Sequence, residues 1–175
     1  AMGGHFAHQD NFELPNTFDG MLEFGPGPVA KYGFILQYTM RMGSWRVRRS
    51  HATCFYGTEA TMVVDRSRIS IAPEPKGKKT QLAAGQLLSE EEEILPADDK
   101  FRHSEVFLEN IRQRKQPETD AQTGHYATNF GHLMNISWEV GRSIRWDGEK
   151  EQVIGDEEAN AFVTKPYRKG WELTV

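Results

Sequence analysis

Six histidines are the side chains of this sequence best suited to metal or acid–base chemistry, and their spacing limits what they could do. His125 and His132 are seven residues apart in a segment with helical periodicity, so they would share a face two turns apart. Seven residues of α-helix rise about 10 Å, which is too far for two imidazoles to bind one ion. We therefore expect no metal site, and interpret His132 as a hydrogen-bonded core residue and His125 as a residue near a helix start.

No motif for nucleophilic or dinucleotide chemistry is complete. Cys54, the single cysteine, lies in an apolar strand pattern, which indicates an inert, buried thiol rather than a reactive thiolate. Gly25-x-Gly27 is the one Gly-x-Gly pair, but Pro26 and Pro28 remove backbone N–H donors and no helical pattern follows. The sequence therefore predicts neither catalytic nor cofactor-binding residues in this chain.

One concentrated basic patch could bind a ligand. It surrounds Trp45 and consists of Arg41, Arg46, Arg48 and Arg49. Guanidinium groups in such a cluster can hold an anionic ligand or phosphate, or can pair with acidic residues of the chain itself or of a neighbouring subunit. From polarity and from expected positions at strand or helix ends, we predict Arg41, His51 and His125 as substrate-binding residues.

Composition sets the class of protein that must position these residues. A chain of 175 residues and 20.0 kDa, with 38% hydrophobic and 26% charged residues, can bury the core of one domain. A net charge of −4 argues against a nucleic-acid partner, and no apolar run reaches the roughly 18 residues of a membrane span. The start has no signal-peptide pattern, so we expect a soluble protein and favour the cytoplasm over export.

The first half of the chain has the two-residue periodicity of β-strands. The alternation is longest over residues 31–42, and shorter strands are predicted at 18–24, 51–56, 60–65 and 68–72. In the 31–42 strand, alternate residues from Tyr32 to Met42 would share one face, and Ile35 would lie with mixed residues on the other. One face is therefore expected to stay partly polar and wet, or to be closed by a partner.

The second half has helical periodicity. Phe107, Leu108 and Ile111 share a face of a first helix that ends before Pro117. A second helix runs from a cap at Asp120 to about Val140, with apolar residues around most of its circumference, so we expect it to be deeply buried. Gly141 is placed to end it, a hairpin follows around residues 147–148, and Asp156 caps a short last helix.

Strands followed by helices predict an α+β fold, in which a largely antiparallel open β-sheet has helices packed on one face. We interpret residues 1–175 as a single domain. A sheet face that the helices leave open would suit a contact between subunits, so we expect a homo-oligomer formed through the sheet.

Several segments, in order along the chain, resemble the Gfo/Idh/MocA family of oxidoreductases, in particular a bacterial branch. Residues 55–66, FYGTEATMVVDR, are similar to its strand–turn–strand, and residues 107–117, FLENIRQRKQP, to a helix and its stop. This chain also resembles the family's next helix, in GHYAT at 124–128 and HLMNI at 132–136, followed by Gly141-Arg142. It resembles the family's C-terminal tail in Trp146-Asp147, GDEEAN at 155–160 and PYRKGW at 166–171.

The resemblance implies the C-terminal part of a dehydrogenase built from two domains. The N-terminal Rossmann domain, which binds NAD or NADP, would be absent, and the C-terminal domain would shape the site for a small, sugar-like or polyol substrate and support oligomerisation. Lys165-Pro166 follows threonine and so does not match the family's Glu-Lys-Pro motif, and none of the family's catalytic residues can be placed in this chain. The implied parent is an oxidoreductase, while this chain alone is expected to be inactive.

A second hypothesis belongs to another class of protein. The chain would be a stand-alone, non-enzymatic binding or structural module that dimerises through its open sheet face. In both readings, NAD or NADP is implied for a full-length parent only, and no cofactor is expected in the chain itself.

Overall fold

The computed structural model describes residues 1–9, 11–43, 51–65, 69–74, 92–94 and 102–172. The chain divides into two compact units, which are described separately below. The first unit comprises Ala1–Gly43 and Glu118–Val175, and the second comprises Ser44–Pro117. The single domain expected over residues 1–175 stays a prediction.

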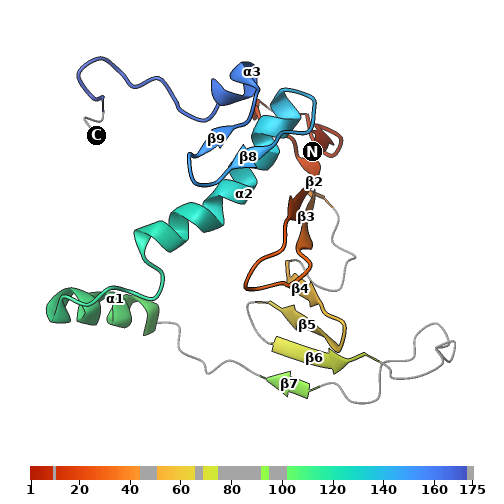
Figure 1. Cartoon of the computed structure of the whole chain (residues 1–175), viewed down its shortest axis with the longest axis vertical. Helices are drawn as coiled ribbons and strands as arrows, with labels where there is room; N and C mark the ends of the chain where they lie inside the picture. Colours follow the sequence, from red (N-terminus) through yellow and green to blue (C-terminus); the bar gives the residue numbers. More distant parts are fainter. Residues whose placement is uncertain (10, 44–50, 66–68, 75–91, 95–101, 173–175) are drawn as a thin grey trace, which may run out of the picture. The chain divides into compact units, whose positions relative to one another are not determined.

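A three-stranded antiparallel sheet forms the base of the first unit (Figure 1). Its strands are β1 (Met2–Gly4), β2 (Thr17–Phe24) and β3 (Phe34–Arg41), in the order β1-β2-β3. Because Gly20 pairs with Tyr38 and Leu22 with Leu36, the apolar side chains of β2 and β3 that share the Phe18 face lie opposite one another. The alternation predicted over 18–24 and 31–42 is therefore confirmed, although β3 begins only after Gly33, which has a φ of +81°.

Helix α2 (Ala121–Glu139) begins and ends where the sequence predicts. The carboxylate of Asp120 accepts a hydrogen bond from the backbone N–H of Thr123 at 2.7 Å, which satisfies one of the unpaired donors of the first turn. At the other end Gly141 takes a left-handed φ of +66°, the conformation that favours glycine just beyond a helix.

The second half of α2 packs on the sheet face that carries Phe18, Gly20 and Tyr38. The Tyr38 ring lies 6.3 Å from the Phe18 ring and 6.5 Å from the Phe130 ring. Met134 lies so close to the sheet that a Cβ on Gly20 would stand 2.5 Å from its sulfur, so any side chain at this position would force Met134 to shift.

Burial on α2 is confined to this second half. The buried residues are Leu133, Met134, Ile136 and Ser137. Tyr126, in the first half, is 56% exposed. The expectation that the helix is deeply buried along its length is therefore wrong for its first turns, because the sheet meets the helix only from about Phe130 onward.

A small second layer closes the end of α2. The hairpin β8 (Trp146–Asp147) and β9 (Gln152–Val153) leads into α3 (Glu157–Asn160), and Val153 packs with Ile136 and Ala159 in a small core. Asp156 caps α3 by accepting from the backbone N–H of Ala159 at 3.0 Å. The hairpin and the capped last helix agree with the sequence pattern.

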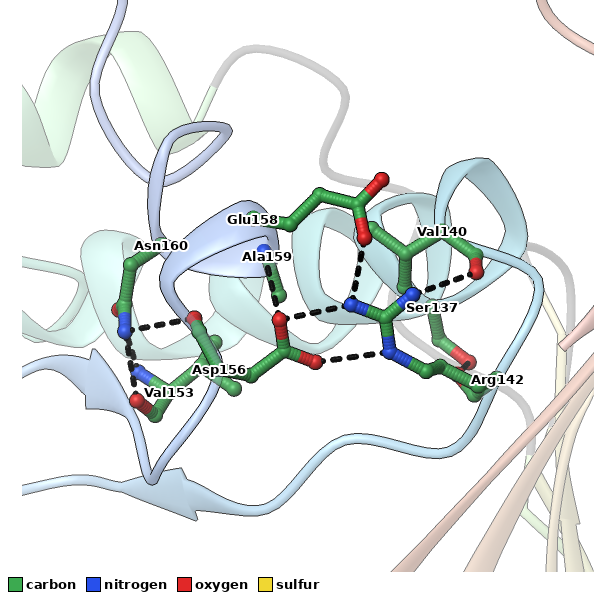
Figure 2. A network of polar contacts seen from close by, with 8 residues as sticks. All are labelled: Ser137, Val140, Arg142, Val153, Asp156, Glu158, Ala159 and Asn160. Atoms are coloured by element: carbon green, nitrogen blue, oxygen red, sulfur yellow. Dashed lines mark hydrogen bonds and ion pairs between the residues drawn. The ribbon is translucent and has the colours of Figure 1, made fainter.

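Figure 2 shows the polar network that fastens this layer to the helix end. Arg142 donates two hydrogen bonds to the carboxylate of Asp156, at 2.9 and 2.7 Å, and a third to Glu158 at 2.7 Å. The guanidinium group, and after it the Ala159 N–H, holds the pKa of Asp156 below its usual range. The side-chain amide of Asn160 accepts a hydrogen bond from the backbone N–H of Val153 and donates one to its carbonyl, which fixes the hairpin to α3.

Among its described residues, the second unit contains an antiparallel sheet and one helix. The sheet has the order β4 (Thr53–Tyr56), β5 (Ala60–Val64), β6 (Ile69–Pro73) and β7 (Glu92–Ile94), and the helix is α1 (Arg102–Gln113). Cys54 is exposed, so the buried thiol expected from the apolar pattern is wrong. The reason is that β4 is the edge strand of this sheet.

The fold class is α+β with open antiparallel sheets, as the sequence predicts. One feature differs from the pattern. The strands within the described ranges belong to three sheets, the third being the β8–β9 hairpin, rather than to one.

Candidate functional site

A pocket of about 900 Å³ lies within the first unit. One wall is strand β2 from Met21 to its end, with Ile35 of β3, and the other walls are α2 and the segment that leads into the β8–β9 hairpin. The sheet leaves room for it because β1 pairs with β2 only from Thr17 to Asp19. Among the described residues, the outer edge of β2 beyond Asp19 therefore has no strand beside it.

The pocket combines apolar surface with groups that form hydrogen bonds. Its apolar lining includes the rings of Phe24, Tyr126, Phe130 and Trp146. Its polar lining includes Glu23, Asn129, Ser137, Ser143, Arg145 and Glu151. A large concave site with a few convergent polar groups is the usual form of a small-molecule site.

His125 contacts two of these polar residues, Glu151 and Asn129. Its Nε2 atom is 2.6 Å from Oε1 of Glu151 and 3.2 Å from the side-chain amide of Asn129, one helical turn further along α2. His125 itself does not line the pocket, whereas both of its partners do. The histidine therefore reaches the pocket only through Glu151 and Asn129.

The backbone of Glu151 has an unusual conformation. Its φ is +49°, in the left-handed region that side chains with a Cβ rarely adopt. The turn before it is held by Asp147, whose carboxylate accepts from the backbone N–H groups of Glu149 and Lys150 at 3.1 Å each. This turn fixes the direction in which Glu151 leaves the hairpin.

The three predicted substrate-binding residues belong to two units: Arg41 and His125 lie in the first and His51 lies in the second. Arg41 lies on the face of β3 opposite Tyr38, where it pairs with Asp19, and Arg41 holds the pKa of the Asp19 carboxyl below its usual range. His51 is exposed in the second unit, and neither it nor Arg41 lines the pocket. Of the basic patch around Trp45, all but Arg41 lies outside the described residues.

The sequence pattern indicated His125, whose role in substrate binding stays a prediction, but it did not indicate the two residues that contact it. Asn129 could have been found, because it lies four residues after His125 on the same face of a predicted helix. Glu151 could not, because its place at the pocket depends on a hairpin folding back on α2. The remaining pocket residues come from strands far away in the sequence, so no local motif marks them.

The described residues do not fit a dinucleotide or a metal. Gly25 and Gly27 lie in the turn between β2 and β3, where the Gly27 N–H bonds to the Ala30 carbonyl at 3.0 Å, and a strand rather than a helix follows. A dinucleotide fingerprint needs a helix N-terminus at that point. Within the described ranges, no group of three or more His, Cys, Asp or Glu side chains could hold a metal ion, and no helix is long and apolar enough to cross a membrane.

Comparison with known proteins identifies the family. Residues 65–173 match the oxidoreductase family, C-terminal alpha/beta domain, of the Gfo/Idh/MocA group. No curated protein and no solved structure matches the chain. The matched segment contains α1, α2, the β8–β9 hairpin and α3, and so supplies the helix and hairpin walls of the pocket. The chain belongs to the Gfo/Idh/MocA oxidoreductase family, whose C-terminal domain it carries.

Proposed function

We propose that this chain is the substrate-binding and oligomerisation domain of an NAD(P)-dependent oxidoreductase that acts on a sugar or polyol. Membership of an oxidoreductase family supports the reaction class. The domain is not catalytically complete by itself, because its described residues do not fit the cofactor that would accept or donate the hydride. Its own contribution is to bind and orient the substrate.

The observation that carries this proposal is the mixed lining of the pocket. A sugar or polyol presents apolar C–H surface and hydroxyl groups together. The Phe130 and Trp146 rings offer flat apolar surface, while Asn129, Ser143 and Glu151 offer hydrogen-bond partners. A volume of about 900 Å³ lies in the range of small-molecule sites and leaves space beside a single sugar ring.

Ligand titration tests this proposal. We expect neutral polyols such as D-glucose or myo-inositol to bind the 175-residue chain and to change the fluorescence of Trp146, which lines the pocket. Because these 175 residues alone bury less of the ligand than they would beside a cofactor-binding domain, we expect millimolar rather than micromolar dissociation constants. NADH and NADPH, titrated by calorimetry as the comparison, should give no micromolar binding.

Either of two results would contradict the proposal. The absence of any response to the polyols up to their solubility limit would exclude a polyol site. Micromolar binding of NADH would show that the chain holds the cofactor despite lacking the glycine fingerprint.

A specific observation also favours the second candidate, a stand-alone module that dimerises through its sheet. Met21 and Ile35, which also border the pocket, are 67% and 68% exposed on the sheet face opposite Phe18 and Tyr38, where they lie diagonally across β2 and β3. Exposed apolar groups on an uncovered sheet face favour self-association. Sedimentation velocity should therefore show a dimer at tens of micromolar chain, and a monomer would contradict the oligomerisation role in both candidates. A dimer that binds no polyol would favour the stand-alone module.

A further inference from the structure

We propose that Glu151 is the residue of the pocket that recognises the hydroxyl groups of the ligand, and that His125 positions it. This inference rests on the proposed function and deepens it, because it names the group that selects the ligand. It follows from three features of the structure: where the proton of His125 lies, which oxygen of Glu151 remains available, and how the hairpin holds Glu151.

The proton of the His125 ring lies on Nε2. A separation of 2.6 Å between Nε2 and Oε1 of Glu151 is a short hydrogen bond, and a carboxylate can only accept. Nε2 therefore donates to Glu151, so it cannot at the same time accept from the amide Nδ2 of Asn129, which lies 3.2 Å away. His125 thus holds one carboxylate oxygen of Glu151 in place and acts through Glu151 rather than on the ligand, while Asn129 lines the pocket itself.

The second oxygen of Glu151 is left for a ligand. No hydrogen bond or ion pair to Oε2 occurs within the described residues, and the Glu151 side chain, 45% exposed, lines the pocket. An ionised carboxylate oxygen can accept hydrogen bonds from two hydroxyl groups, which is the pattern that a vicinal diol presents. Oxygen acceptors of this kind bind hydroxyl groups more strongly than neutral acceptors do.

The charge of Glu151 disfavours an anion placed beside it. Glu23 on the β2 wall and Glu151 on the hairpin wall are the two carboxylates of the described lining, which also contains Arg145 and the α-amino group of Ala1, bound to Ser137. A ligand carboxylate or phosphate placed near Glu151 would be repelled and would find no donor on that residue. A neutral sugar avoids this cost, because its hydroxyl groups can donate.

The backbone of the hairpin points to the same residue. The left-handed φ of Glu151 would suit glycine better, yet the position carries a glutamate. Asp147 fixes the turn before it, and the backbone hydrogen bond from Ile154 to Arg145, at 2.7 Å, closes the hairpin behind it. The strained residue is therefore the one whose side chain enters the pocket.

Substitution of the carboxylate by its neutral analogue tests the inference. Glu151→Gln keeps the size of the side chain but removes its charge, so we expect the dissociation constant for D-glucose, measured by NMR titration of the intact chain, to rise about tenfold. The matched control is Glu149→Gln in the same hairpin, which does not line the pocket and should change the constant less than twofold. His125→Ala should weaken binding about threefold to tenfold, and His125→Gln, which can still donate to Glu151, should restore most of the loss.

Selectivity separates recognition from a structural effect. We expect Glu151→Gln to weaken the binding of D-glucose. The binding of D-glucuronate should be unchanged or stronger, because the repulsion between the two carboxylates disappears. A general loss of structure would instead weaken the binding of both ligands. Glu151→Gly relieves the backbone conformation, so it should remain folded while losing D-glucose binding to the same extent.

The outcomes distinguish this inference from the proposed function. If the unmodified chain binds D-glucose and Glu151→Gln binds it equally well, the role of Glu151 is overturned while the polyol site stands. If the unmodified chain binds no neutral polyol, both fail. If Glu151→Gln and Glu149→Gln weaken binding alike, the hairpin rather than the Glu151 carboxylate matters, and the inference is overturned.

Discussion

Met134→Ala should lower the free energy of unfolding of the first unit by about 2–5 kcal/mol, the usual cost of truncating a buried methionine. Met134 is 3% exposed and lies against Gly20 of β2, so its loss would leave a cavity between α2 and the sheet. Gly20 has no side chain that could fill that space. Urea denaturation followed by the fluorescence of Trp138 and Trp146, both in this unit, measures the change.

The matched control is Met21→Ala, in β2, on the face of the strand opposite Phe18 and Gly20. Met21 is 67% exposed, so Met21→Ala should change stability by less than about 0.5 kcal/mol. Equal effects of the two substitutions would mean that α2 does not pack on the Phe18 face of the sheet. The described pocket, which is lined by residues of both α2 and the sheet, would then also be contradicted.

Gly33→Ala should destabilise the β2–β3 hairpin by at least about 2 kcal/mol, because a Cβ is disfavoured in the left-handed region and would also meet backbone. Gly33 has a φ of +81°, and a Cβ at this position would stand 2.2 Å from the carbonyl oxygen of Phe24. The carbonyl oxygen of Phe24 is a backbone atom, so it cannot move away as the end of a flexible side chain could. The hairpin end would have to open, which shifts Phe24, whose ring stacks on Phe34 at 4.5 Å.

Gly27→Ala in the same turn is the control for this prediction. A Cβ on Gly27 would meet nothing within 4 Å, and its φ lies outside the left-handed region. We therefore expect Gly27→Ala to be neutral or slightly stabilising in the same denaturation experiment. A Gly33→Ala chain as stable as Gly27→Ala would contradict the described turn geometry.

Local patterns in the sequence predicted most of the elements of the fold. Period-two alternation located β2 and β3 because each strand has one covered and one open face. The caps at Asp120 and Asp156, and the helix stop at Gly141, were predictable because each depends on neighbouring residues alone. The segments from residue 107 onward that indicated the family lie within residues 65–173, which the family comparison matches, whereas the segment 55–66 lies almost wholly before them.

Features that depend on distant pairing could not be predicted in this way. Strand β1 was missed because two of its three residues are glycines, which give no alternation. The exposure of Cys54 depends on β4 being an edge strand, which its own residues do not reveal. The role of Glu151 requires the hairpin to bring it back to His125, 26 residues earlier in the chain.

The central claim is that the pocket of the first unit is the substrate site of an oxidoreductase domain. Residue-resolved NMR of the labelled chain with saturating D-glucose tests it most directly. We predict that the largest amide shifts fall on the three walls of the pocket, at residues 21–25, 129–134 and 143–151. Shifts confined to the second unit, or no shifts at saturating sugar, would contradict the account.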